Sequence, residues 1–243
     1  MNKPFEGLAF CCTSIPARLR EELAHKITSM GGIHYSDLMS DVNYLVVGDR
    51  KTDKYNYCVK YRHDVKFVRS DSILKVHDLW LAGEDSIDLL TLENYLIPIF
   101  DGLVVCMSRI DHDGLHQKLM AESFRLDGAS DVLAGFDVYR PRALAKIIEE
   151  NGGKVTESLT VGNSCVITTE KKGKRYLKAL EWGITTVHPI WVFDSILRMA
   201  ALKLEDYELG SSETYGNGCK VWDKLLLANE PDVAPKKVVE VAK

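Results

Sequence analysis

Two pairs of side chains in this sequence combine a hydroxyl group with a cation at repeated distances from glycine. The hydroxyl residue follows a glycine by six positions in both cases, Gly7 to Thr13 and Gly102 to Ser108. The cation follows the first residue of a Gly-Gly pair by 23 positions in both cases, Gly31 to Lys54 and Gly152 to Arg175. A hydroxyl and a cation together supply strong hydrogen bonds to an anion such as a phosphate. The spacing therefore predicts two anion-binding sites within an internal duplication.

The duplication has a period of nearly one hundred residues, which is enough for a complete small domain in each copy. The hydroxyl precedes the Gly-Gly pair by 18 positions in the first copy and by 44 in the second, so the second copy carries an insertion. We predict a first domain over residues 1–83, a linker over 84–99, and a second domain over 100–206 with an insert at about 111–139. Residues 207–243 are predicted to be a C-terminal extension, disordered in part because its end has little apolar content.

Apolar runs and helical periodicity in the first copy predict the order β-α-β-β-α-β-α. The predicted elements are 7–12, 17–30, 33–35, 44–47, 54–61, 65–68 and 72–82. The second copy repeats the pattern, with elements predicted at 103–107, 142–151, 164–168, 176–182, 185–187 and 189–201. Strands joined by helices indicate an α/β fold with two domains, each a four-stranded parallel sheet flanked by helices.

Composition excludes several classes of function. The net charge of −4 disfavours a general binder of polyanions. The sequence has no apolar run long enough to predict a membrane span, and no membrane partner is expected. The six cysteines form no CxxC pair and are expected to be reduced core residues. His112 and His116 have the spacing of a helical metal pair but lack an obvious third ligand, so neither a metal nor a cofactor is predicted.

Several motifs in order resemble those of the BRCT domain, a small α/β module of checkpoint and replication proteins. They are Cys12-Thr13-Ser14, Gly31-Gly32, Val42–Gly48, Lys54-Tyr55 and, in the second copy, Trp191–Ile196. The resemblance covers roughly residues 5–205. Within that family the Cys-Cys-Thr-Ser-Ile opening is most similar to the N-terminal BRCT pair of the topoisomerase II-binding protein scaffolds. The polymerase-associated replication-initiation scaffold of budding yeasts belongs to this group.

The resemblance implies recognition of phosphoserine and phosphothreonine without catalysis. In the first copy it assigns the phosphate to the Thr13 hydroxyl, the Ser14 amide, Arg20 and Lys54. In the second copy it assigns Ser108 and Arg175. Weaker candidates are Lys174, next to Arg175, and Arg140 and Arg142 on either side of Pro141, the position that matches Arg20. The implied partners are a replication initiation factor phosphorylated by cyclin-dependent kinase and phosphorylated DNA damage checkpoint proteins, in the nucleus.

Other interpretations of the same residues stay open at this point. Thr13 could be an N-cap of the first helix, and Lys54 a solvated lysine at a helix start. Lys171, Lys172 and Lys174 could form a solvated basic turn. At the level of function, the module could hold the 5′-phosphate of a DNA end, with DNA as a secondary partner, or be a non-catalytic appendage of a DNA repair enzyme.

Overall fold

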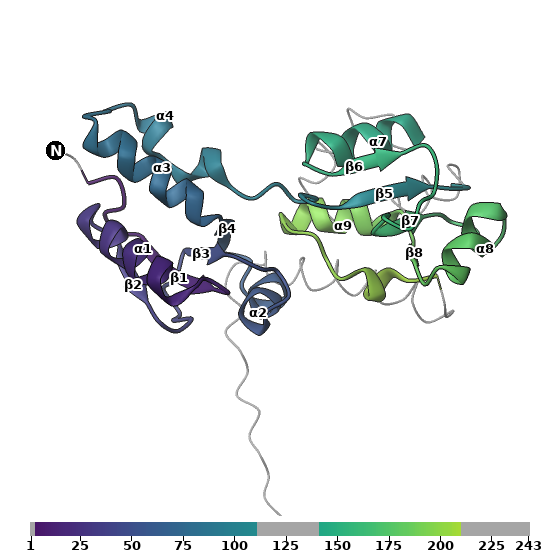
Figure 1. The fold of residues 1–243 in the computed structure, drawn as a ribbon, viewed down its shortest axis with the longest axis horizontal. Helices are drawn as coiled ribbons and strands as arrows, with labels where there is room; N and C mark the ends of the chain where they lie inside the picture. The colour runs from purple at the N-terminus through teal and green to yellow at the C-terminus, as the bar shows by residue number, and fades with distance from the viewer. Residues whose placement is uncertain (1–2, 111–140, 210–243) are drawn as a thin grey trace, which may run out of the picture. The chain divides into compact units, whose positions relative to one another are not determined.

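The computed structural model describes residues 3–110 and 141–209 of the chain (Figure 1). The chain divides into two compact units, Met1–Pro98 and Ile99–Lys243. In the described ranges, each unit contains one four-stranded parallel sheet, which confirms the predicted fold class. No helix in these ranges is long and apolar enough to cross a bilayer.

The first unit follows the predicted element order. Its elements are β1 (Ala9–Thr13), α1 (Ala17–Ser29), β2 (Ile33–Tyr35), β3 (Tyr44–Val47), α2 (Asp53–Tyr61), β4 (Lys66–Val68), α3 (Ser70–Leu81), α4 (Ile87–Leu90) and the 3-10 helix η1 (Leu92–Tyr95). The sheet order is β2-β1-β3-β4, with β1 in the middle. Gly31 ends α1 with a φ of 92°, a conformation that favours glycine, as the Gly-Gly pair predicted.

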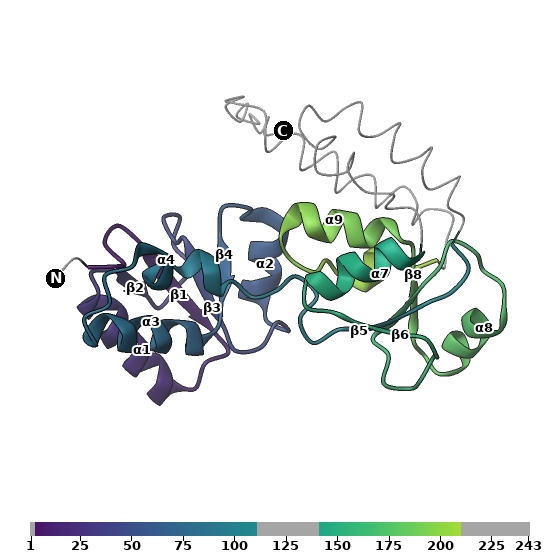
Figure 2. The ribbon, with the colours of Figure 1, turned by 90° about the horizontal axis from the view of Figure 1, so that it is seen from above.

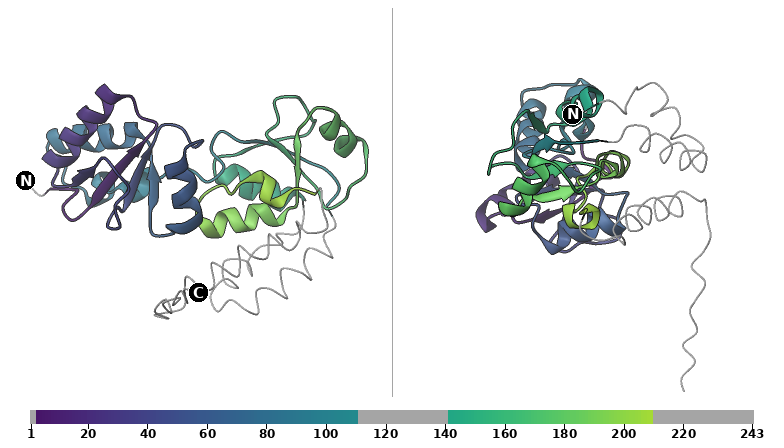
Figure 3. Two further views of the ribbon diagram at one scale, coloured as in Figure 1. Left: turned by 90° about the horizontal axis from the view of Figure 1, so that it is seen from below. Right: turned by 90° about the vertical axis from the view of Figure 1, so that its right-hand side faces the viewer.

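The two faces of the first sheet are covered by different helices (Figures 2 and 3). Leu23 and Ile27 of α1 and Ile73 of α3 pack with Phe10 and other residues on one face. On the other face the ring of Tyr55 of α2 lies 4.8 Å from that of Phe67, tilted by 50°. All five residues of β1 are buried, and neighbouring strand residues point to opposite faces, so β1 contributes side chains to the core on each face of the sheet. Its carboxyl end lies between α1 and α2.

The second unit has the same architecture. Its described elements are β5 (Val104–Met107), α7 (Pro141–Glu150), β6 (Lys154–Thr156), β7 (Cys165–Ile167), α8 (Lys174–Glu181), β8 (Thr185–Val187), α9 (Ile190–Arg198) and η2 (Leu204–Tyr207). The sheet order is β6-β5-β7-β8, so each strand occupies the place of its counterpart in the first unit. Helices α7 and α9 share one core with the sheet, and α8 lies on the opposite face (Figure 2).

Strand β6 was not among the predicted elements. This edge strand has three residues and buries none of them completely, so it lacks the apolar run that marks the central strands. It pairs in parallel with β5, matching Val155 to Val105.

Each unit has a 3-10 segment near the end of its described residues, which the predicted boundaries place in the linker for the first unit and divide at residue 206 for the second. The 3-10 helices η1 and η2 have nearly the same sequence, Leu92-Glu-Asn-Tyr95 and Leu204-Glu-Asp-Tyr207. Each is followed by an antiparallel bridge to the fourth strand of its sheet, Val68 to Leu96 and Val187 to Glu208. Leu92 and Tyr207 are buried in the cores of their units. Residues 87–96 are therefore part of the first unit rather than only a linker, and the second unit continues past 206.

Candidate phosphate-binding sites

Lys54 is the second residue of α2 and reaches across the carboxyl edge of the first sheet. Its Nζ donates a hydrogen bond of 2.7 Å to the carbonyl of Ser36, the residue that follows β2. A weaker contact of 3.6 Å runs to Sγ of Cys11 in β1. This lysine is therefore anchored to two strands, which excludes a merely solvated side chain at a helix start.

Arg175 occupies the equivalent place in the second unit. It is the second residue of α8, and its Nη2 donates 2.6 Å to the carbonyl of Glu157, the residue that follows β6. Its Nη1 donates 2.6 Å to the carbonyl of Met107, directly before Ser108. Both units thus anchor the cation of the second long helix at the same corner of the sheet. A guanidinium has five N–H donors, so these two bonds leave others for an anion.

Thr13 is the last residue of β1 and is buried. Its Oγ1 is 2.8 Å from Oγ1 of Thr52, which is the N-cap of α2 and accepts a hydrogen bond from the amide of Tyr55. Thr13 is not the N-cap of α1, because Pro16 occupies that position. Thr52 was not among the predicted site residues. A Ser or Thr two positions before the predicted site lysine is the signal that could have revealed it.

Ser14 turns the chain between β1 and α1 in a left-handed conformation with a φ of 53°. Its carbonyl oxygen lies so close to Gly48 that a Cβ on Gly48 would approach it to 2.0 Å. Glycine at this point of the loop after β3 therefore lets two loops meet at the carboxyl edge of the sheet. Ser14 is exposed at this edge, and phosphate binding by its amide stays a prediction.

Arg20 lies on the exposed side of the first turns of α1, and its charge acts on the same residues as that of Lys54. Burial raises the pKa of the Cys12 thiol to about 12, and the two cations oppose that rise. Burial and then the same two cations lower the pKa of His34, whose Nε2 is 3.4 Å from Cys12 Sγ. Arg20 and Lys54 therefore combine their fields beside the end of β1.

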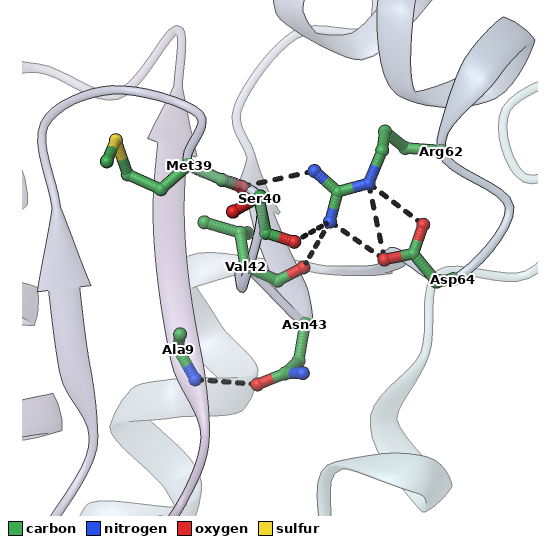
Figure 4. Close-up of polar contacts among 7 residues, drawn as sticks. All are labelled: Ala9, Met39, Ser40, Val42, Asn43, Arg62 and Asp64. Atoms are coloured by element: carbon green, nitrogen blue, oxygen red, sulfur yellow. Dashed lines mark hydrogen bonds and ion pairs between the residues drawn. The ribbon is translucent and has the colours of Figure 1, made fainter. Parts of the chain in front are cut away.

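The connection between β2 and β3, which begins at Ser36, is clamped by the other end of α2 (Figure 4). The guanidinium of Arg62 donates to the carbonyls of Met39, Ser40 and Val42 at 2.9–3.1 Å. It also pairs with Asp64 at 2.7 Å. The loop is thus fixed to α2 by Lys54 at one end of the helix and Arg62 at the other, which holds the Ser36 carbonyl in place for Lys54.

Ser108 follows β5, and its amide donates 2.9 Å to the carbonyl of Ile167. The next residue, Arg109, has a firmly held backbone, because its carbonyl accepts bonds from the Thr169 amide and the Thr168 hydroxyl. Gly173, which has no side chain, is the N-cap of α8 at the position that Thr52 occupies in the first unit. A hydroxyl and a cation again lie at the end of the first strand.

Comparison with known proteins agrees with this duplicated architecture. The family profile described as BRCA1 C Terminus (BRCT) domain matches residues 2–76 and 131–196, more than half of the chain. The chain belongs to the BRCT family. The two units are therefore two BRCT domains, which confirms the resemblance found in the motifs.

The relatives of these BRCT domains include two yeast regulators. The chain is 29% identical to the S-M checkpoint control protein rad4 of Schizosaccharomyces pombe, over 90% of the chain and 30% of that protein. It is 26% identical to the DNA replication regulator DPB11 of Saccharomyces cerevisiae, over 92% of the chain and 32% of that protein. The chain spans about a third of the length of these relatives.

A solved structure similar to this BRCT pair is that of Rad4 BRCT1,2 in complex with a Crb2 phosphopeptide. It has a TM-score of 0.66 and 28% identity, and the match covers 85% of this chain and all of the other. The structure of Rad4 BRCT1,2 with a Mdb1 phosphopeptide gives a TM-score of 0.64.

The structure gives only the helix position and the exposure of the remaining predicted residues of the second BRCT domain that it describes. Lys174 is the first residue of α8, exposed beside Arg175, and Arg142 is exposed near the start of α7. Arg140, the pair His112 and His116, and the predicted insert lie outside the described residues. Among the described residues no contact joins Arg142 to Ser108, and a role of Arg142 in phosphate binding stays a prediction.

Proposed function

We propose that this tandem BRCT module binds phosphoserine and phosphothreonine segments of other proteins, one at each of the two sites. The observation that carries the proposal is the repeated anchoring of Lys54 and Arg175 beside a hydroxyl at the end of the first strand. The similar Rad4 BRCT1,2 structures, which hold Crb2 and Mdb1 phosphopeptides, support it.

The chemistry of the first site suits a phosphate dianion. Lys54 and Arg20 supply two positive charges, and hydrogen bonds to a charged acceptor are shorter and stronger than neutral ones. The Thr13 hydroxyl and the Ser14 amide add neutral donors, and the N-terminal end of α1 favours an anion. Such a site binds through preorganised donors and requires no bond to break, so we assign the module no catalytic activity.

The relatives are replication and checkpoint regulators, and this suggests the biological setting. We infer a nuclear scaffold whose partners are a replication initiation factor phosphorylated by cyclin-dependent kinase and phosphorylated checkpoint proteins. The net charge of −4 favours peptide phosphates over the polyanionic backbone of DNA.

Titration of the chain with matched peptides tests the proposal. Fluorescence anisotropy should show binding of phosphothreonine peptides and at least tenfold weaker binding of their unphosphorylated forms. A duplex with a 5′-phosphate serves as the competitor. Equal binding of both peptide forms would refute the proposal, and displacement of the phosphopeptide by equimolar duplex would favour the DNA-end alternative.

A further inference from the structure

The loops that lead into the two cation-bearing helices differ in charge. In the first BRCT domain the loop is Gly48-Asp-Arg-Lys-Thr-Asp-Lys54, with three cations and two carboxylates. In the second it is Thr169-Glu-Lys-Lys-Gly-Lys-Arg175, with four cations and one carboxylate. Lys54 and Arg175 are the last residues of these loops and occupy equivalent positions, so the two seven-residue loops can be compared residue by residue. The two candidate sites therefore have an equivalent hydroxyl and cation but differ in the charge of the adjoining loop.

Arg109 adds a further cation that the first domain lacks. It follows Ser108 directly, where the first domain has the neutral Ser14 after Thr13. Its side chain runs along the start of α8, since a Cβ on Gly173 would lie 3.1 Å from Nε of Arg109. Gly173 also has a φ of 100°, which favours glycine. The glycine thus leaves room for Arg109 next to the helix start that carries Arg175.

Glu170, the single carboxylate of this loop, lies beside two cations. Oε2 of Glu170 lies 3.9 Å from Nη1 of Arg109 and 3.4 Å from Nζ of Lys172. Within the described residues this oxygen is buried and accepts no hydrogen bond of ordinary length. The side chains of Arg109 and Lys172 are 64% and 68% exposed, so both cations remain accessible to an anion in solution.

We propose that the second site selects phosphorylated segments that carry further negative charge beside the phosphoresidue. Arg109 is the residue that pairs with this additional charge. Ser108 and Arg175 hold the phosphate, while Arg109, Lys172 and Lys174 attract neighbouring Asp, Glu or phosphorylated residues. The first site, whose loop mixes three cations with two carboxylates, has little preference of this kind. The inference rests on the proposed phosphopeptide binding and adds the class of segment that each site takes.

The test uses the full chain with the first site disabled by Thr13→Ala and Lys54→Ala. Two phosphothreonine peptides are compared by anisotropy, one with Asp and Glu around the phosphothreonine and one with Ser and Gln at the same positions. Each exposed ion pair multiplies affinity by about 1.5 to 5. We expect the acidic peptide to bind roughly tenfold more tightly, with most of this advantage lost at about 0.5 M salt, where exposed charges are screened.

Two matched variants assign the effect. Arg109→Gln in the same background should reduce the advantage to about threefold or less, while the neutral phosphopeptide changes by less than about twofold. A chain with Ser108→Ala and Arg175→Ala, which keeps only the first site, should show an advantage of about twofold or less. The melting temperature of each variant confirms that it is folded.

The outcomes separate this inference from the proposed function. Equal affinity of the second site for acidic and neutral phosphopeptides overturns the inference alone, as does an advantage that survives in Arg109→Gln. Binding of the unphosphorylated acidic peptide as tightly as its phosphorylated form overturns the proposed function. A 5′-phosphorylated duplex that binds the second site more tightly than the acidic phosphopeptide assigns the basic surface to DNA instead.

Discussion

Oγ1 of Thr13 and Oγ1 of Thr52 form a hydrogen bond of 2.8 Å that joins the end of β1 to the start of α2 in the first BRCT domain. The same helix start carries Lys54, so the hydroxyl and the cation of this site are fixed to one another through the N-cap. In the second domain Gly173 replaces the threonine, and Arg175 donates instead to the carbonyl of Met107, the residue before Ser108. The two sites therefore reach similar geometry by different local contacts.

Removing the hydroxyl of Thr52 should weaken both folding and binding. In Thr52→Val the amide of Tyr55 loses its cap and Thr13 loses its partner, which should cost about 1 kcal/mol of unfolding free energy. Phosphopeptide affinity of the first site should fall by a factor of about three to ten, in line with one hydrogen bond. Thr52→Ser retains the hydroxyl and is the control. Urea unfolding and anisotropy measure the two effects, and identical behaviour of the two variants would contradict this role.

Lys54→Ala should weaken phosphopeptide binding of the first site by about 1.5–3 kcal/mol, which is roughly ten- to a hundredfold. The melting temperature should change little, because the lost bond to the Ser36 carbonyl lies at the surface. Lys54→Arg is the matched control, since the second domain uses arginine at the equivalent position. Isothermal titration calorimetry with a neutral phosphothreonine peptide checks the prediction. Loss of affinity in Lys54→Arg equal to that in Lys54→Ala would show that the site requires an ammonium group.

The two sites should contribute unequally to a singly phosphorylated peptide with neutral neighbours. The pair Thr13→Ala and Lys54→Ala should abolish most binding of that peptide, because the first site has a hydroxyl, Arg20 and Lys54 together. The pair Ser108→Ala and Arg175→Ala should matter mainly for doubly phosphorylated partners, where linkage raises avidity. Titration of both variants with singly and doubly phosphorylated peptides decides the ranking. The reverse pattern would assign the dominant pocket to the second domain.

The repeated 3-10 segment should be essential to the stability of the first domain. Leu92 is 1% exposed within the core, so Leu92→Ala should cost about 2–4 kcal/mol of unfolding free energy. Leu89→Ala is the control at an exposed neighbouring position and should cost less than about 0.5 kcal/mol. Urea unfolding followed by tryptophan fluorescence compares them. Similar urea midpoints for the two variants would mean that residues 84–99 only connect the two domains and do not stabilise the first.

The buried thiols should stay protonated in the native state. Burial raises the pKa of Cys12 and of Cys165 to about 12, so native ionisation requires strongly alkaline solution. In the unfolded chain these thiols ionise at lower pH, and their contribution to stability is therefore present below about pH 8.5 and lost as the pH rises towards 12. Alkylation by iodoacetamide at about pH 8.5, in a Cys219→Ser background, should proceed only as fast as unfolding. Rapid labelling of Cys12 in the native protein would contradict its burial.

Much of the fold was predictable because the central strands have strong sequence signals. Runs such as Tyr44–Val47 are wholly apolar and buried, and the Gly-Gly pairs mark where the first helices end. The edge strand Lys154–Thr156 has no such run, and its place depends on pairing with β5. The near-identity of Leu92–Tyr95 and Leu204–Tyr207 was visible in the sequence. A four-residue match does not by itself predict a structural element, and the shared role appears only in the bridges that follow both copies to the fourth strand.

The candidate sites were predictable only in part. Constant spacing within the duplication correctly predicted that Lys54 and Arg175 occupy equivalent positions, although phosphate binding by them stays a prediction. Thr52 stands two positions before Lys54 in the sequence, but its contact with Thr13 and the position of Arg109 depend on how separate loops meet. The contact between Thr13 and Thr52 spans 39 positions, and Arg109 lies against Gly173 because the glycine has no side chain. Such contacts follow from tertiary packing rather than from local sequence.

The duplication of one site within a single chain has a consequence for signalling. A partner held by both BRCT domains must carry two modified residues at once, so its retention depends on the product of two phosphorylation probabilities rather than on either alone. If the two modifications are independent, a threefold rise in each gives about a ninefold rise in doubly engaged partner. The chain would then convert a gradual increase in kinase activity into a steeper, threshold-like assembly response.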